Sequence, residues 1–169
     1  MLQYKYRKQL VLNRKLPRYK FIGILSDEFL LRARSDCNDR RSTIELTKKN
    51  NHFIDDYSDL ENYDQRHTDI ELPSVFNVFG KIHDLRYGIL ESRKKIPSHI
   101  DAPDGHRFIA MVQGNHVYHT DGLNIGMNEG SVWFINSSYE HGVDNLGDED
   151  RIALLGKFND TTKLLRTIT

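Results

Sequence analysis

The sequence predicts a mainly β fold with flanking helices, in which antiparallel strands form a jelly-roll barrel. Residues 86–160 contain short segments rich in β-branched and aromatic residues, separated by turn signals such as "TDG", "NEG" and "GDED". Short strands at this spacing are typical of antiparallel barrels or sandwiches rather than parallel sheets. Residues 1–85 mix helical and strand patterns, as expected for helices packed on one sheet of such a barrel.

The first part of the chain begins with strand patterns and continues into a helix. Aromatic and β-branched residues favour strands over residues 4–13 and 19–25. The segment "SDEFLLRAR", residues 26–34, predicts a short helix with Ser26 as its N-cap.

A polar segment and a second helix are expected next. Residues 50–70 are polar and acidic and are interpreted as a loop. In residues 73–85 the apolar side chains have helical spacing, and Pro73 suits a first helical turn, so a helix is predicted there.

The second part of the chain is expected to be β throughout. The predicted strands are residues 85–92, 107–114, 116–120, 123–127, 131–136, 141–146 and 151–158. On the strand "HVYHT", His116 and His119 would point to opposite faces, which favours an ordinary hairpin over a second metal site. Trp133 and Phe134 are expected in the core and barrel wall.

Composition is that of a soluble globular protein and excludes several classes of function. The 169 residues suffice for one domain with a hydrophobic core, and 24 basic and 24 acidic residues balance, so neither nucleic acid nor a membrane surface is an expected partner. No apolar run approaches the roughly 20 residues of a membrane-spanning helix. Cys37 is the only cysteine, which excludes an intramolecular disulfide and favours a cytoplasmic setting.

Charge is unevenly placed along the chain. Residues 1–20 are basic and residues 55–71 are mostly acidic. Two solvated faces explain this pattern most simply, and a docking surface for a charged partner is the alternative.

Four residues form a pattern that suits a metal centre. His99 and Asp101 lie two residues apart in "IPSHID", so both side chains share one side of an extended strand, and His141 stands before a later predicted strand. Two imidazoles and one carboxylate form the facial triad of non-haem Fe(II) oxygenases. Arg151, ten residues after His141, offers a planar charged group that can hold the far carboxylate of a 2-oxo acid such as 2-oxoglutarate.

These segments resemble the Fe(II)/2-oxoglutarate-dependent oxygenases of the aspartyl/asparaginyl β-hydroxylase type, which are related to bacterial proline hydroxylases. The motifs that carry the resemblance are "IPSHID", "HRFIAMVQGN", "GSVWFINSSYEHGVDN" and "DEDRIAL". The resemblance covers about a third of the chain, and the first half shows no convincing match. The chain has Asp101 where animal members have glycine, and Ile109 where the family usually has a histidine.

The resemblance implies a double-stranded β-helix (a jelly-roll or cupin-like barrel) and a single oxygenase domain over residues 1–169. Residues 1–85 would support the substrate site, and residues 86–160 would form the catalytic half of the barrel. It implies that His99, Asp101 and His141 bind Fe(II), that Arg151 binds the co-substrate 2-oxoglutarate, and that Arg107 is a further basic co-substrate contact.

The expected activity is that of a dioxygenase that uses O2 and 2-oxoglutarate to hydroxylate an amino-acid side chain, releasing succinate and CO2. The substrate would be a free amino acid such as proline, or Asp, Asn or Pro in a peptide. Arg66, Arg86 and Arg93 are candidates for binding the charged ends of a free amino acid.

Several alternatives stay open at this point. His99 and Asp101 form a hydrogen-bonded surface pair in the simplest alternative, and Arg151 pairs with Asp148 or Glu149 in the adjacent turn. Asn136 is either a structural residue or a hydrogen-bonding neighbour of the iron. For the whole domain, one alternative is a non-catalytic jelly-roll binding module with a vestigial metal site. Another keeps the oxygenase but has it hydroxylate a protein partner that docks on the acidic residues 55–71. Substrate identity and oligomeric state are not determined by the sequence.

Overall fold

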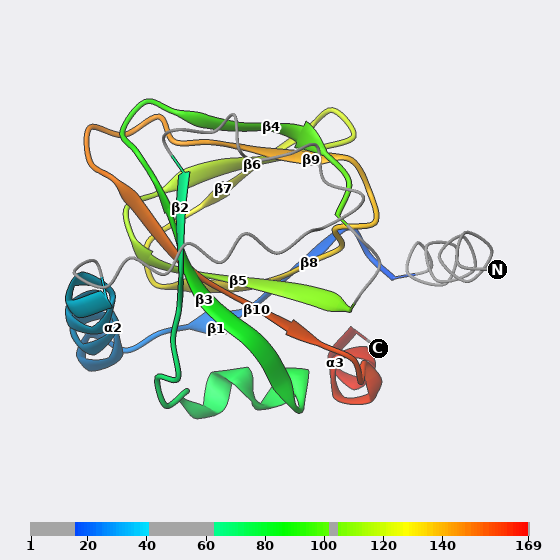
Figure 1. The fold of residues 1–169 in the computed structure, drawn as a ribbon. Helices are drawn as coiled ribbons and strands as arrows, with labels where there is room; N and C mark the ends of the chain where they lie inside the picture. Colours follow the sequence, from blue (N-terminus) through cyan, green and yellow to red (C-terminus); the bar gives the residue numbers. More distant parts are fainter. Residues whose placement is uncertain (1–15, 41–62, 102–104, 169) are drawn as a thin grey trace, which may run out of the picture.

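Two antiparallel sheets face each other to form the barrel (Figure 1). The computed structural model describes residues 16–40, 63–101 and 105–168. In these residues one sheet has six strands in the order β1-β8-β5-β10-β3-β2, and the other has four in the order β4-β9-β6-β7. The predicted fold class, a mainly β double-stranded β-helix of the jelly-roll or cupin type with flanking helices, is confirmed.

The strands are short and mostly follow the segments expected from the sequence. The six-stranded sheet contains β1 (Tyr19–Ile24), β2 (Tyr63–His67), β3 (Ile82–Leu90), β5 (His106–Gln113), β8 (Ser131–Ile135) and β10 (Arg151–Phe158). The four-stranded sheet contains β4 (Lys95–His99), β6 (His116–Thr120), β7 (Leu123–Met127) and β9 (His141–Asp144). The helical segments are α2 (Asp27–Arg40), the 3-10 helix η2 (Ser74–Phe79) and α3 (Thr162–Ile168).

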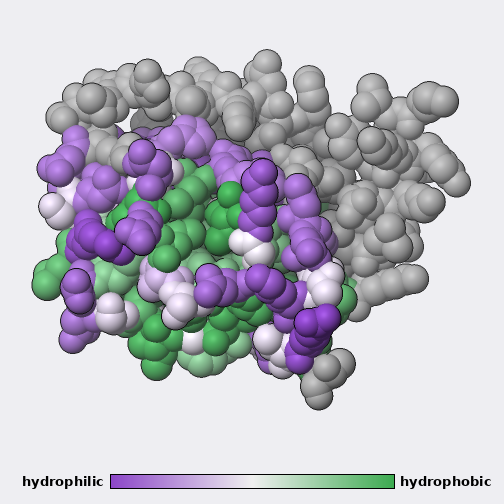
Figure 2. Space-filling model, turned by 90° about the horizontal axis from the view of Figure 1, so that it is seen from below, coloured by the Kyte–Doolittle hydropathy of each residue, from purple (hydrophilic) through white to green (hydrophobic). Residues whose placement is uncertain are grey.

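The helices cover the outer face of the six-stranded sheet (Figure 1). The α2 helix begins after Ser26, whose hydroxyl accepts a hydrogen bond from the backbone N–H of Phe29 at 3.1 Å, as the sequence predicts for an N-cap. Phe76 and Phe79 of η2 pack on Phe108 of β5, with ring centroids 5.2 and 4.9 Å away. Apolar side chains gather in the middle of this face, and hydrophilic ones surround them (Figure 2).

A second core lies between the two sheets. Its buried members are Leu90, Ile96, Ile109, Met111, Tyr118, Met127, Ile135, Val143 and Ala153. Because side chains alternate along a strand, β5 and β10 contribute every second residue to this inner core and the others to the helical layer.

Two expectations about the first part of the chain are wrong. The helix predicted over residues 73–85 is only the short η2, because Gly80 adopts a left-handed φ of 66° and ends it, and β3 begins at Ile82. The loop predicted over residues 50–70 contains β2, which pairs with β3 along its whole length. A strand with few apolar residues forms here because backbone pairing with an edge of the sheet stabilises it.

Some expectations lie outside the described residues, and some elements were not expected. The strand predicted over residues 4–13 lies outside the described residues, as do residues 50–62 of the expected loop, residues 1–15 of the basic segment and residues 55–62 of the acidic segment. Neither β4 nor α3 was among the segments expected from the sequence. The extended strand assumed for His99 and Asp101 ends at His99, so Asp101 lies just after β4.

Candidate metal centre

The barrel brings His99, Asp101 and His141 together. His99 is the last residue of β4 and His141 is the first of β9, and the two are paired across these antiparallel strands. Their imidazole ring centroids are 4.4 Å apart. The backbone N–H of Asp101 donates to the carbonyl of Ser137 at 3.1 Å, which fixes the segment after β4 against the turn before His141.

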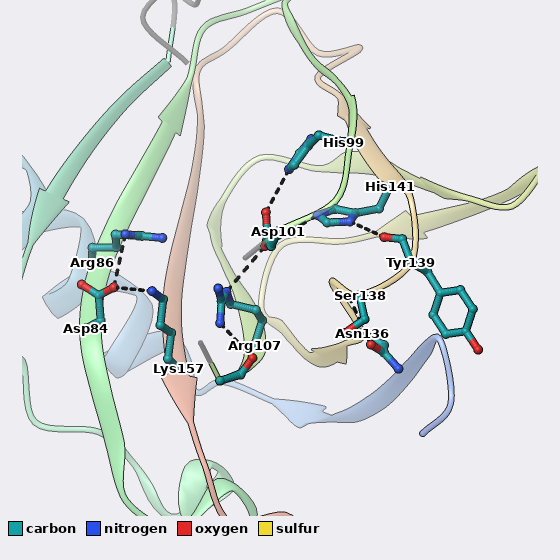
Figure 3. Close-up of polar contacts among 11 residues, drawn as sticks. Asp84, Arg86, His99, Asp101, Arg107, Asn136, Ser138, Tyr139, His141 and Lys157 are labelled. Atoms are coloured by element: carbon teal, nitrogen blue, oxygen red, sulfur yellow. Dashed lines mark hydrogen bonds and ion pairs between the residues drawn. The ribbon is translucent and has the colours of Figure 1, made fainter. Parts of the chain in front are cut away.

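The side chains of the three residues converge (Figure 3). One Asp101 oxygen lies 3.2 Å from Nε2 of His99, and the other lies 3.9 Å from Nε2 of His141. One ligand atom from each residue can be chosen so that all three lie within 4.8 Å of one another. The alternative considered from the sequence, a surface pair of His99 and Asp101, does not account for His141, which lies beside both residues in the fold.

Both imidazoles are oriented by the backbone. Nδ1 of His99 lies 2.7 Å from the carbonyl oxygen of Pro97, and Nδ1 of His141 lies 2.8 Å from that of Tyr139. A carbonyl oxygen only accepts, so each Nδ1 carries the proton and each Nε2 faces Asp101. This arrangement is typical of metal-binding histidines, whose second nitrogen is held by a hydrogen bond.

The protonation states also suit a metal ion. Burial by itself raises the pKa of Asp101, but the hydrogen bond from His99 and the positive charges nearby outweigh it and hold the pKa well below its usual value. Burial lowers the pKa of His141, although the charge of Asp101 opposes this shift. An ionised carboxylate and a neutral imidazole are the forms that bind metal, so these residues fit a divalent cation.

A glycine allows the two ligand strands to approach. A Cβ atom added at Gly142 would lie 3.0 Å from the carbonyl oxygen of Ile96 and 3.3 Å from the backbone nitrogen of Ser98. The residue after His141 therefore has no side chain at a point where the β4 backbone leaves little room for one. This close approach brings the two histidines opposite each other.

Arg151 lies inside the barrel, beside the backbone of β3. It is 1% exposed, and its Nη1 donates to the carbonyl of Gly88 at 3.1 Å. Its register partner is Leu90, a member of the inner core, so both residues are on the inner side of the six-stranded sheet. In the adjacent turn, Asp148 pairs with Arg93 at the surface.

Arg107 approaches the triad from β5. Its Nε lies 3.5 Å from an Asp101 oxygen, and its Nη1 donates to the carbonyl of Gly105 at 3.0 Å. Ile109, two residues further along the same strand face, is 3% exposed and belongs to the inner core. An apolar side chain thus occupies the place where the family usually has a histidine.

The remaining expectations about polar residues agree with a structural role. Asn136 accepts a hydrogen bond from the backbone N–H of Ser138 at 3.2 Å and donates to the carbonyl of Leu16 at 3.3 Å. His116 and His119 lie on β6, paired with β7 in a hairpin, and Nε2 of His119 lies 3.0 Å from Asp144.

Tyr118 and a second polar cluster lie near the triad, and of these residues the sequence singled out only Arg86. The ring of Tyr118 stacks on His141 with centroids 5.6 Å apart, and in the described part of the chain its buried hydroxyl has no hydrogen-bond partner. Asp84, Arg86 and Lys157 form a second polar cluster beside Arg107 (Figure 3). Lys157 in the apolar segment "RIALLGKF" was an available signal, because it shares a strand face with Arg151.

Solved structures with a similar fold come from several bacteria. A predicted oxalate decarboxylase from Thermotoga maritima is 20% identical with a TM-score of 0.44, over 58% of this chain and 81% of that chain. A cupin superfamily protein from Desulfitobacterium hafniense is 11% identical with a TM-score of 0.42, over 59% and 80% of the two chains. A protein of unknown function from Streptococcus pyogenes is 13% identical with a TM-score of 0.43, over 58% and 75%. The curated proteins gave no match.

The family model for aspartyl/asparaginyl β-hydroxylases matches residues 59–161. The matched part of the chain runs from the segment before β2 to the end of β10 and includes the triad, Arg107 and Arg151. Among the described helices, none is both long and apolar enough to span a membrane.

Proposed function

Because this chain belongs to the aspartyl/asparaginyl β-hydroxylase family, we propose that it is an Fe(II)- and 2-oxoglutarate-dependent dioxygenase. The reaction would hydroxylate an unactivated C–H bond of an amino-acid side chain, free as in proline or within a peptide as in Asp, Asn or Pro. The observation that carries the proposal is the convergence of His99, Asp101 and His141, with both Nε2 atoms facing the carboxylate.

The triad would hold the iron, and the barrel fixes its ligands before the metal arrives. Both nitrogens of His99 face oxygen acceptors, so a cation at Nε2 is favoured, whether a proton or a metal ion. Metal binding would release that proton, and the affinity for metal would fall at acid pH. Bound Fe(II) with 2-oxoglutarate and O2 would supply the oxidant, with succinate and CO2 as the other products.

Arg151 is proposed to hold the far carboxylate of 2-oxoglutarate. It is buried on the inner side of β10, and its hydrogen bond to Gly88 directs the guanidinium along the barrel interior. An arginine kept away from water makes stronger hydrogen bonds to a carboxylate than a solvated one does. Arg107 is proposed as a further basic contact, since it already lies against Asp101.

Two other parts of the site support ligand binding. Burial, and then the charge of Asp101, raise the pKa of Tyr118, so its hydroxyl stays protonated and is a donor for a ligand oxygen. Ile109 and Tyr118 belong to the inner core, which would limit the access of water to the reacting centre. The buried thiol of Cys37, the one cysteine of the sequence, is in keeping with a cytoplasmic setting.

The proposal is tested by adding Fe(II) and 2-oxoglutarate to the protein without oxygen and recording the weak visible charge-transfer band. The wild type and His119→Ala, a control histidine in the same four-stranded sheet, should give the band, and His99→Ala should not. Arg151→Ala should raise the dissociation constant for 2-oxoglutarate roughly 10- to 100-fold, as for the loss of about 1.5–3 kcal/mol, without changing metal affinity.

The competing interpretation is a non-catalytic binding module with a vestigial metal site. It predicts no band in the wild type, or the same band in wild type and His99→Ala. Either result would refute the oxygenase proposal.

A further inference from the structure

A second group of basic side chains faces the barrel interior next to the triad (Figure 3). Lys157 of β10 is paired directly with Arg107 of β5, which lies 3.5 Å from Asp101. Arg86 of β3 is paired with Leu155, which belongs to the rim of the inner core. Since directly paired residues share a sheet face, the side chains of Arg86 and Lys157 lie on the same inner face as Arg107.

A β-bulge places a carboxylate between Arg86 and Lys157. On β3, Asp84 and Leu85 lie opposite the single residue Gly156 of β10. Asp84 has a φ of 53°, which is uncommon for any residue except glycine and is typical of the first residue of such a bulge. A strained residue held in a sheet beside a metal centre is a sign of a functional constraint.

The carboxylate of Asp84 is shared by the two cations. Nζ of Lys157 lies 3.1 Å from Asp84 Oδ2, and Nη1 of Arg86 lies 3.4 Å from the same oxygen. Nε of Arg86 is buried and has no hydrogen-bond partner among the described residues. Burying the N–H of a charged group costs free energy unless an acceptor binds it. An anionic ligand that accepts from Arg86 Nε would remove this cost.

We propose that Arg86 and Lys157 form a carboxylate-binding subsite for the substrate, with Asp84 as the positioning residue. This inference rests on the proposed function and names the substrate class: an amino acid or peptide that presents a free carboxylate beside the metal centre. Arg86 supplies the planar donor group, Lys157 a second positive charge, and the bulge at Asp84 sets the separation between them.

The subsite is distinct from the proposed 2-oxoglutarate anchor. Lys157 and Arg151 lie six residues apart on β10, or roughly 20 Å along the strand. Arg151 is paired with Leu90 at the end of β3, whereas Arg86 lies in the middle of β3 and is paired with Leu155. One cationic group would therefore hold the co-substrate and the other the substrate, with the triad accessible to both.

The other two arginines considered from the sequence are less suited to this role. Arg66 donates to Asp64 two residues away on the same strand, at 2.8 Å from its Nε. Arg93 is 62% exposed and pairs with Asp148 at the surface. Of the three candidates, only Arg86 combines a position on the inner face with a buried donor that has no partner.

The subsite can be tested without any turnover by following the Arg86 Nε–H signal by NMR in the full chain, with and without Zn(II). Acetate is the carboxylate probe and acetamide its neutral control. Acetate should shift the signal saturably and acetamide should not. Arg86→Met identifies the signal, and Lys157→Met should raise the dissociation constant for acetate at least tenfold. Arg93→Met, which removes an equal charge from the surface, should leave it unchanged.

The link to the substrate is tested in the Fe(II)-loaded enzyme by substrate-stimulated succinate formation. Free amino acids, their carboxamides, and paired Asp and Asn peptides serve as probes, so that an α-carboxylate and a side-chain carboxylate are distinguished. Arg86→Met should abolish stimulation by the carboxylate probe and change the dissociation constant for 2-oxoglutarate less than threefold.

Three results would overturn the inference: no saturable acetate shift, equal stimulation by a carboxylate and its amide, or a tenfold loss of 2-oxoglutarate affinity in Arg86→Met. The last result would make the pair part of the co-substrate anchor. Failure of the proposed function itself would appear separately, as the absence of the iron charge-transfer band in the wild type, while the acetate titration would still report on the subsite.

Discussion

The two cores of this protein use the same strands in opposite ways. Outer residues of β10 such as Ile152 and Leu154 are apolar and pack against the helical layer. Inner residues of the same strand include two buried cations, Arg151 and Lys157. Burying a charge costs free energy, whereas burying an apolar side chain contributes about 25 cal/mol per Å2. The outer core therefore supplies stability, and the inner core uses part of it to hold a polar site.

The outer core is best tested by replacing Phe108, because the rings of Phe76 and Phe79 of η2 both contact the Phe108 ring. Phe108→Ala should lower the free energy of unfolding by about 3–5 kcal/mol, because it leaves a large cavity in a fully packed region. Urea unfolding of the metal-free protein measures this.

Phe21→Ala is the control, since Phe21 is 48% exposed and rests on Trp133. It should cost below about 1.5 kcal/mol. In Phe108→Ala the metal affinity of the folded protein should change less than threefold, because the ring faces away from the triad. A large loss of metal affinity would mean that the two cores are not separate in function.

The inner core should show its polar character in the dependence of stability on pH. Burial, and then the charge of Arg151, lower the pKa of His116 well below its usual value of 6.5. The unfolded chain therefore binds a proton below about pH 6.5 that the folded chain does not bind. Stability falls as pH drops below this value, by about 1.4 kcal/mol per pH unit for one group, until the lowered pKa is reached.

His116→Gln should remove this contribution. Unfolding free energies are compared between pH 6.5 and 5 with a chelator present, so that competition between protons and metal does not enter. The change of unfolding free energy with pH should be smaller in the variant than in the wild type, by up to about 1.4 kcal/mol per pH unit. Equal slopes would show that His116 gains its proton in the folded state as readily as in the unfolded one.

The difference between the two cores also explains what the sequence could predict. Strand segments such as residues 116–120 and 151–158 were found because alternation and turn residues are local signals. The triad of His99, Asp101 and His141 was found because the spacing of these residues is a motif. The cluster of Asp84, Arg86 and Lys157 was not found, because a bulge and the register of two strands bring it together, and neither is visible in the order of residues.

The predicted boundaries of helices and strands were wrong for a related reason. The apolar residues from Val75 to Ile82 have helical spacing, but Ile82 belongs to a strand that continues beyond the turn at Gly80. Local periodicity does not show where a turn divides one apolar pattern between two elements. The polar β2 has no apolar pattern of its own, because pairing with β3 stabilises it.

The prediction with the smallest expected effect tests whether a residue positions the triad without stabilising the fold as a whole. Gly142 lies where β9 passes β4, and a Cβ atom there would be 3.0 Å from the backbone oxygen of Ile96. Gly142→Ala should push the strands apart by a few tenths of an ångström and misalign His141 with His99. The dissociation constant for Fe(II) or Zn(II) should rise about fivefold, close to 1 kcal/mol.

Gly126→Ala is the matched control in the same sheet, because a Cβ atom there meets nothing within 4 Å. It should leave metal affinity unchanged and either preserve or slightly raise stability, since alanine reduces the freedom of the unfolded chain. Isothermal titration with metal, together with urea unfolding of both variants, makes the comparison. If the two glycines respond alike, the close approach of β4 and β9 does not set the geometry of the metal ligands, and the segments on either side of the histidines position them instead.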